Sequence, residues 1–267
     1  MIKLDSSSNA SFLQQIQQKQ DSILEKLSSG KRVNSAADGA AAQQIIDRLT
    51  SQVEGNRQSI SNAYDGISLA QVAEGGLAGI NEDVNRIREL SVQAGNGLLN
   101  DGDRKALQSE VSQLQQNISQ TIKQTEFGGK ALLSGSGSLD FQIGANAGQK
   151  IGVQTNDVAA GLSDILNVDL STAQGAQDAL AAADSAVDYV GNARADLGAT
   201  QNRFESAARN LAQTDINVTE ARSRIQDTDY AQASAELASA NLLSQSSIAV
   251  QSMANQQKGQ VLSLLNG

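Results

Sequence analysis

The sequence predicts a mainly α protein: a long antiparallel helical bundle or coiled coil whose N- and C-terminal segments pair, plus a small β-hairpin insert. Three observations lead to this prediction. The 267 residues include no Pro, which is the residue that breaks helices most strongly. Apolar residues recur at helical spacing in both halves of the chain. Between the halves lies a Gly-rich stretch in which polar and apolar residues alternate, as they do in strands.

The most regular apolar pattern lies in the second half. Between Leu180 and Ile225, ten of fourteen positions at alternating three- and four-residue spacing are apolar, which forms a heptad seam. The first half carries a similar pattern over residues 46–70, and a shifted one continues over residues 77–87. A shift of this kind overwinds a coiled coil locally and does not end the helix. The two seams are expected to pair within one subunit through Leu49, Val53, Ile60, Ile67, Leu197, Phe204, Leu211 and Val218.

The helix boundaries follow from the same patterns. The first long helix is expected from about residue 44 to residue 95. A third, shorter apolar stripe over residues 107–118 follows a loop rich in Asn, Gly and Asp. Asp103 precedes this stripe and is the expected N-cap, because an Asp side chain accepts hydrogen bonds from free amides at a helix start.

The stretch between the two halves predicts the β-hairpin. Residues 139–143 and 150–154 alternate, and a Gly-containing loop separates them. Just before them, residues 134–138 read Ser-Gly-Ser-Gly-Ser, which is typical of a surface loop. The candidate positions for glycosylation in this loop are Ser134, Ser136 and Ser138.

Composition and charge exclude several classes of function. Without His or Cys, the chain has no imidazole base, thiolate nucleophile or His-ligated zinc site, so we expect neither an enzyme nor a cofactor. A net charge of −9 disfavours binding to nucleic-acid phosphates. No window approaches the ~20 apolar residues of a membrane span, so no membrane partner is expected.

The two ends of the chain are nearly free of charge yet carry apolar stripes. Residues 6–18 contain no charged side chain, and residues 230–257 contain only Glu236. A helix of this kind is poorly stable alone in water. The alternatives are frayed termini or segments that neighbouring copies bury. For the second alternative, the expected polymer interface consists of Phe12, Ile16, Ile23, Leu27, Leu237, Leu242, Ile248, Val261 and Leu265.

Several longer stretches resemble bacterial flagellins. In the first half these are LSSGKRVNSAADG at 27–39, NAYDGISLAQVAEG at 62–75 and NRIRELSVQ at 85–93. In the second half they are LGATQNRFES, EARSRIQDTD and QVLSLL, which begin at residues 197, 220 and 260. The resemblance covers nearly the whole chain, in order.

The resemblance implies a domain organisation. Residues 1–40 with 226–267 correspond to an inner core coiled coil that is disordered in the monomer, and 41–127 with 175–225 correspond to an outer core helical bundle. The insert at 128–174 is short, so the chain looks like a core-only flagellin without large variable outer domains.

The resemblance also implies a function: a structural subunit that polymerises into the helical filament of the bacterial flagellum and so serves swimming motility. Two alternatives are a hook-filament junction protein, with homologous ends, and a helical-bundle module for binding or signalling. The expected location is the extracellular filament. Because residues 1–8 lack the apolar stretch of a signal peptide, export without a cleaved N-terminal signal is expected.

Partners are implied in the same way. They are other copies of the chain, a flagellar export chaperone at the C-terminal segment, and the filament cap and hook-filament junction proteins. By resemblance, the vertebrate Toll-like receptor 5 contacts the helix that contains NRIREL and a Glu on the next helix. The matching residues are Arg86, Glu89, Leu90 and Glu110.

Overall fold

The structure is a computed structural model that describes the backbone of residues 6–265 and the side chains of residues 11–257 and 260. It confirms the mainly α fold with a small antiparallel hairpin. Contacts divide the chain into two compact units. We call Met1–Val53 with Ile216–Gly267 the terminal unit, and Glu54–Asp215 the bundle unit.

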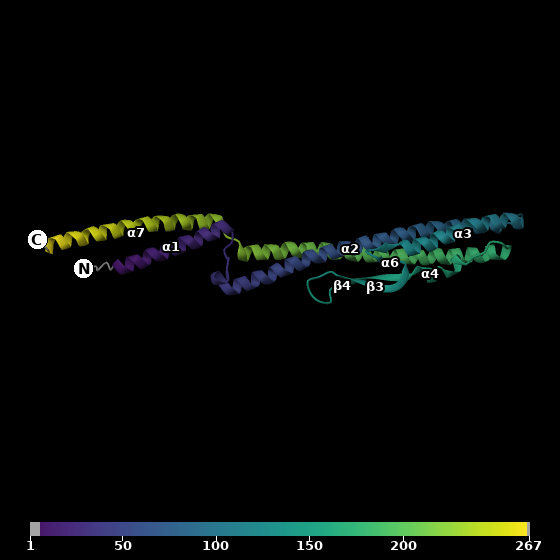
Figure 1. Ribbon diagram of the computed structural model, residues 1–267, viewed down its shortest axis with the longest axis horizontal. Coiled ribbons are helices and arrows are strands. Elements are labelled where there is room, and N and C mark those ends of the chain that lie inside the picture. The colour runs from purple at the N-terminus through teal and green to yellow at the C-terminus, as the bar shows by residue number, and fades with distance from the viewer. Residues whose placement is uncertain (1–5, 266–267) are drawn as a thin grey trace. The chain divides into compact units, whose positions relative to one another are not determined.

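Long helices dominate both units (Figure 1). Two short helices and four strands lie between the third and fourth long helices. The long helices are α1 (Ser6–Ser29), α2 (Ala36–Ala94), α3 (Asp101–Gln124), α6 (Ala173–Gln226) and α7 (Tyr230–Leu265). The remaining elements are β1 (Glu126–Phe127), β2 (Lys130–Ala131), β3 (Ser134–Gln142), β4 (Lys150–Asp157), α4 (Val158–Gly161) and α5 (Ser163–Leu166).

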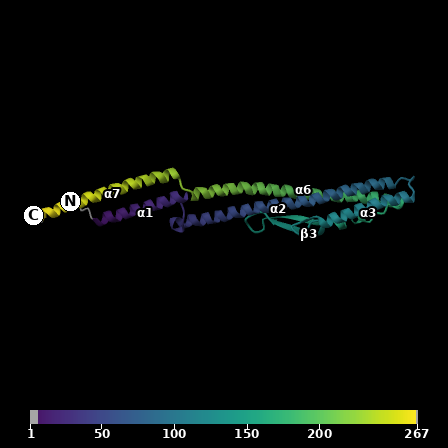
Figure 2. The same ribbon diagram turned by 45° about the horizontal axis from the view of Figure 1, so that its top comes forward.

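In the terminal unit, α1 packs antiparallel against α7, and the two lie side by side in both views (Figures 1 and 2). The amide of Gln20 donates to the Asn241 side-chain oxygen at 2.9 Å. Near the other end of α1, the Tyr230 hydroxyl donates to the Leu27 carbonyl. Apolar contact is modest, because the fully buried residues that α7 contributes are alanines. This cluster contains Ile23, Ala233 and Ala240, with Leu27 and Leu237 packed beside them.

In the terminal unit, backbone hydrogen bonds join the segment that follows α1 to the segment that precedes α7. The Arg32 amide donates to the Gln226 carbonyl at 2.6 Å, and the Thr228 amide donates to the Gly30 carbonyl at 3.0 Å. Gly30 has a φ of +69°, in the left-handed region where Gly carries no Cβ penalty. The end of α1 and the start of α7 are thereby held together.

Asp38 closes the turn between α1 and α2. Its Oδ2 accepts from the Ser35 amide at 2.9 Å and the Asn34 amide at 3.0 Å. These backbone bonds are the main cause that holds the pKa of Asp38 below its ordinary value of 3.8. The sequence pattern predicted a helix start near residue 44, but α2 begins at Ala36, with a kink at Gly39 where the backbone is not helical.

The bundle unit is built on α2, α3 and α6, which run together in both views. Arg57 pairs with Asp215 at 3.4 Å and Arg88 pairs with Asp184 at 2.6 Å. The two Arg residues are 31 positions apart, and so are the two Asp residues. The antiparallel pairing of α2 with α6 therefore keeps one register over roughly 46 Å, at 1.5 Å per residue. Its core includes Ile80, Val84, Ile87, Val111, Ile118 and Val190, all fully buried.

The hairpin of β3 and β4 is anchored to the bundle. Its register pairs Leu139 with Val153. The Asn62 amide on α2 donates to the Gln142 carbonyl at 2.9 Å. The rings of Phe141 and Phe204 meet edge to face, with centroids 5.5 Å apart. A Cβ added to Gly66 would lie 2.5 Å from the Phe204 ring, so α2 has room for that ring only because residue 66 is Gly.

Two local predictions were wrong. Asn100, not Asp103, is the N-cap of α3, and its Oδ1 accepts from the Asp103 amide at 3.0 Å. Asp103 lies at the third helical position and accepts in return from the Asn100 amide at 3.2 Å, which completes a capping box. The residues 134–138 are not a loop but the first part of β3, opposite Thr155 and Gln154 of β4. Pairing with β4 outweighs the low strand propensity of Gly and Ser.

Candidate functional site

The helix α7 carries a set of exposed large apolar side chains, which lie on more than one side of the helix. Leu242 is 67% exposed and Met253 is 65% exposed. At 100° per residue these two positions lie on the side of the helix opposite to Ala240, which is buried against α1. We call the exposed set the α7 apolar surface. It consists of Leu242, Leu243, Ile248, Val250 and Met253.

This surface is not a scatter of single apolar residues. Five large apolar residues occur within twelve positions of one helix, and residues 237–257 around them contain no charged side chain. Exposed apolar patches of this kind mark sites of protein association. With large exposed apolar residues and no charged side chain in this stretch, α7 has the character of a helix that gains stability from further neighbours besides α1.

The residues predicted for the polymer interface fall into two groups in the structure. Ile16 and Ile23 are buried, and Leu27 and Leu237 are half-buried. Phe12, Leu242 and Ile248 are exposed. The side chains of Val261 and Leu265 lie outside the described residues. The predicted stripe therefore mixes residues that pair α1 with α7 and residues that remain available to a neighbour. Three residues of the α7 apolar surface were not among those predicted for the polymer interface: Leu243, Val250 and Met253.

The predicted intrasubunit seam residues occupy both units. Val53, Leu197 and Phe204 are buried, and Phe204 has no exposed area. The others, which are half-buried, are Leu49, Ile60, Ile67, Leu211 and Val218. In the bundle unit, Ile67, Leu197 and Phe204 belong to the main apolar cluster or pack against it.

Three of the four candidate receptor contacts form an exposed ion-pair cluster on α2 and α3. Arg86 donates through Nε and Nη2 to Glu110 Oε1 at 2.9 and 2.7 Å, and through Nη1 to Glu89 at 3.0 Å. The hydrogen bond to Glu110 is the largest cause of the raised pKa of Arg86. Leu90 does not belong with them. It is 1% exposed and lies in the core, so its prediction as a surface contact was wrong.

Sequence reasoning missed a cap at the end of α2. Arg104 on α3 is buried, and its guanidinium donates to the Ala94 carbonyl and, at 3.1 Å, to the Asn96 carbonyl. These carbonyls lie at the C-terminal end of α2, where the helix has no partners of its own for them. A lone Arg near a helix start carries no sequence signal for this role.

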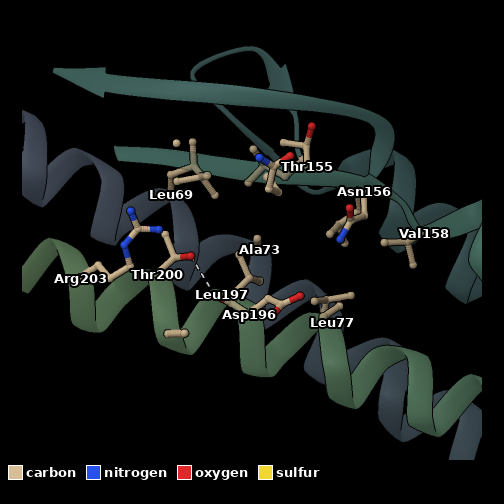
Figure 3. Close-up of a pocket in the computed structure, with 17 residues that line it drawn as sticks. Leu69, Ala73, Leu77, Thr155, Asn156, Val158, Asp196, Leu197, Thr200 and Arg203 are labelled. Carbon is tan, nitrogen blue, oxygen red and sulfur yellow. Dashed lines mark hydrogen bonds between the residues drawn. The ribbon is translucent and has the colours of Figure 1, made fainter. Parts of the chain in front are cut away.

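A cleft of about 380 Å³ lies within the bundle unit, between β4, α2 and α6 (Figure 3). Leu69, Ala73 and Leu77 line it from α2, and the polar residues Thr155 and Asn156 line it from β4. The polar side chains on α6 are Asp196, Thr200 and Arg203. Thr200 donates to the Asp196 carbonyl at 2.8 Å, an internal helix bond. The lining therefore shows no nucleophile paired with a base.

Within the described residues, no three or more His, Cys, Asp or Glu side chains come together in a way that could hold a metal ion. No helix in that part of the chain is long and apolar enough to span a membrane. The exposed Ser134, Ser136 and Ser138 lie on β3, and their glycosylation stays a prediction.

Comparison with family models gives two matches. Residues 3–138 match the bacterial flagellin N-terminal helical region, and residues 180–265 match the bacterial flagellin C-terminal helical region. The interval between the two matches contains the end of β3, then β4, α4, α5 and the start of α6.

Named proteins resemble the chain over nearly its full length. It is 39% identical to a flagellin of Bacillus subtilis, over 91% of this chain and 91% of the relative. It is 35% identical to the flagellar filament 30.7 kDa core protein of Treponema maltophilum, again over 91% of each chain.

Solved structures show the same fold at low identity. A flagellin of Bacillus cereus aligns with a TM-score of 0.53 and 24% identity, over 57% of this chain and 88% of that one. A putative flagellar hook-associated protein of Vibrio parahaemolyticus aligns with a TM-score of 0.59 and 15% identity, over 71% of this chain and all of that one.

Proposed function

Because the chain belongs to the bacterial flagellin family and is a structural subunit of the extracellular flagellar filament, we propose that the α7 apolar surface is where one subunit binds the next. The observation that carries this proposal is the exposure of Leu242, Ile248 and Met253 on an almost uncharged helix. The chain is not an enzyme. The junction-protein alternative is less supported, because the matching relatives are named as flagellins and filament core proteins.

Burial of this surface supplies free energy for assembly. Covering a large apolar side chain such as Leu242 contributes about 1.5–3 kcal/mol. A contact between different surfaces of identical subunits does not close on itself, and so it extends into a helical filament. Phe12 on α1 is exposed as well, and we assign it to the same class of contact.

The division into filament domains is part of the proposal. We assign residues 1–40 with 226–267 to an inner core that orders on assembly, and 41–127 with 175–225 to an outer core bundle. The short insert at 128–174 then takes the place of larger outer domains. The exposed apolar side chains on α7 and the small buried residues between α1 and α7 support the dependence of the inner core on neighbours.

The direct test is polymerisation of purified subunit with ammonium sulfate or filament seeds. Light scattering and negative-stain microscopy would follow the full chain beside a version without residues 1–40 and 226–267. We expect filaments from the full chain and none from the shortened one. Filaments from both would contradict the assignment of assembly to the terminal segments.

The C-terminal segment that contains α7 is also the proposed site for an export chaperone. The filament cap and the hook-filament junction proteins are proposed to bind the subunit surfaces that are exposed at the two ends of the filament. An apolar helix face binds a groove through residues at three- and four-residue spacing. Pull-down with a chain that ends at Asp229 tests the chaperone site. Retention of chaperone by that shortened chain would place the site elsewhere.

Recognition by Toll-like receptor 5 is proposed at the cluster of Arg86, Glu89 and Glu110, which is exposed and held by the hydrogen bonds of Arg86. Arg86→Ala is expected to lower receptor activation. Arg88→Ala is the matched control, because Arg88 is two positions away and pairs instead with Asp184 on α6. Equal responses from the two variants would remove this assignment.

A further inference from the structure

The loop between α2 and α3 contains the dipeptide Asn96-Gly97. Among residues 6–265, this is the only Asn that is followed directly by Gly. We propose that Asn96 is a site of spontaneous deamidation, which converts its side-chain amide into a carboxylate. This modification is separate from the assembly function proposed above, because it needs neither α1 nor α7.

The geometry of the loop favours the reaction. Asn96 and Gly97 are both exposed and lie outside the helices. In the part of the chain that the structure describes, the Gly97 N–H has no hydrogen-bond partner, so its nitrogen is free to act as a nucleophile. The Leu98 amide donates to Asn96 Oδ1 at 3.1 Å. That bond folds the side chain toward the following main chain and polarises the amide carbonyl that is attacked.

The residue after Asn96 adds no obstruction. Gly97 has no Cβ to shield its nitrogen, and no other atom lies within 4 Å of the place where a Cβ would be. Glycine also reaches the main-chain conformations needed for ring closure more readily than any other residue.

The covalent steps balance without an oxidant or reductant. The Gly97 nitrogen gives its proton to hydroxide and forms a bond to Cγ of Asn96. The side-chain nitrogen then takes a proton from water, which regenerates hydroxide, and leaves as ammonia. The product is a five-membered succinimide ring. Water then adds to one of the two ring carbonyls and opens the ring. The outcome is Asp at position 96, or isoaspartate with the main chain routed through Cβ and Cγ.

Other Asn residues lack one of the features that favour Asn96. Ser35 follows Asn34, but its amide donates to Asp38 at 2.9 Å, and the Asn34 side-chain amide donates to Ser29 at 2.8 Å. Asn146 lies in the exposed hairpin loop, but it precedes Ala147, whose methyl group hinders attack. These two sites are internal controls for an occupied nucleophile and for a hindered one.

The modification would change the end of α2. Arg104 donates to the main-chain carbonyl of Asn96 at 3.1 Å, and isoaspartate inserts a methylene into that main chain. In either product the new carboxylate follows the C-terminal end of α2, where the helix dipole disfavours negative charge. The aged subunit is therefore expected to melt at a lower temperature than the fresh one.

The test is to incubate the purified full chain in mildly alkaline buffer made with ¹⁸O-water and to map its peptides by mass spectrometry. We expect one ¹⁸O in Asp and isoaspartate at position 96, at a rate proportional to hydroxide concentration. Fragmentation must distinguish position 96 from the nearby Asn100. A protein isoaspartate methyltransferase with a labelled methyl donor reports the isoaspartate independently.

The variant Gly97→Ala is expected to lose the modification on the same time scale. Alanine fits this open position, and circular dichroism and melting temperature verify that the variant is folded. Faster conversion at Asn34 or Asn146 than at Asn96 would overturn the proposal. So would unchanged conversion in the Gly97→Ala chain, or a product without isoaspartate, which would indicate direct hydrolysis of the amide.

Discussion

The terminal unit and the bundle unit are built from the same kind of long helix, but they place their large apolar side chains differently. In the bundle unit Ile80, Val84 and Ile87 are fully buried within one chain. In the terminal unit the helix α7 buries only Ala233 and Ala240 fully against α1, while Leu242 and Met253 remain exposed. The difference supports our proposal that the terminal helices, unlike the bundle, depend on neighbouring subunits for much of their stability.

The largest effect is expected from substitutions in the α7 apolar surface, which should weaken polymerisation. Leu242→Gln with Met253→Gln is expected to raise the critical concentration for polymerisation by at least about tenfold, because each side chain contributes about 1.5–3 kcal/mol on burial. Sedimentation of polymer from a concentration series measures this. Ser234→Gln, an exposed change on the same helix, is the control. Equal critical concentrations would mean that this face is not buried in the filament.

Phe204→Ala should break the bundle unit instead. Phe204 is fully buried and its ring fills the space that Gly66 leaves open. Removing a buried Phe side chain costs about 3–5 kcal/mol, which urea unfolding of the monomer would measure. Leu211→Ala, at a half-buried position of the same helix, should cost less. A larger loss at Leu211 would show that the tight core does not centre on Phe204.

Arg104→Ala should have an intermediate effect. Its guanidinium donates to carbonyls at the end of α2, and loss of a hydrogen bond from a charged donor costs about 1.5–3 kcal/mol; because water can replace Arg104 at these carbonyls, the total loss is expected to stay within this range. The monomer should lose stability by this order, and the assembly of filaments should change little. Lys105→Ala, at the next position and exposed, is the control. Similar thermal melts for the two variants would contradict the role of Arg104 as a cap.

The smallest expected effect is on how the stability of the terminal unit depends on pH. Because the folded chain lowers the pKa of Asp38, its carboxylate stabilises the fold above its ordinary pKa of 3.8, and this contribution is lost as pH falls through the lowered value. Asp38→Asn should therefore reduce stability near neutral pH and weaken the acid dependence. Melting temperatures of both chains across acidic pH would measure it, and parallel curves would contradict it.

Much of the fold could be predicted from the sequence because the helices are long and regular. A chain without Pro and with sustained heptads has few alternatives to paired helices. The two faces of α7 could not be separated in this way. Its inner face uses Ala233 and Ala240, whose small side chains give a weak apolar signal, so the larger Leu242 and Ile248 dominated the pattern.

Local errors had a different cause. Asn100 and Asp103 are both good N-cap residues, and only the hydrogen bonds of the folded loop distinguish the cap from its reciprocal partner. Leu90 follows Arg86 and Glu89 in a motif, yet it turns to the core while those two side chains stay exposed. A linear motif contains no information on which of its residues share a face.

The contact of Gln20 with Asn241 joins positions 221 residues apart, and this has a consequence for the order of folding. Contacts between such distant positions require closure of a very long loop and form slowly. The terminal unit therefore cannot be complete until almost the whole chain is available, whereas local turns such as the β3–β4 hairpin can form early. The segments that we propose to join one subunit to another are thus expected to be the last to acquire their structure.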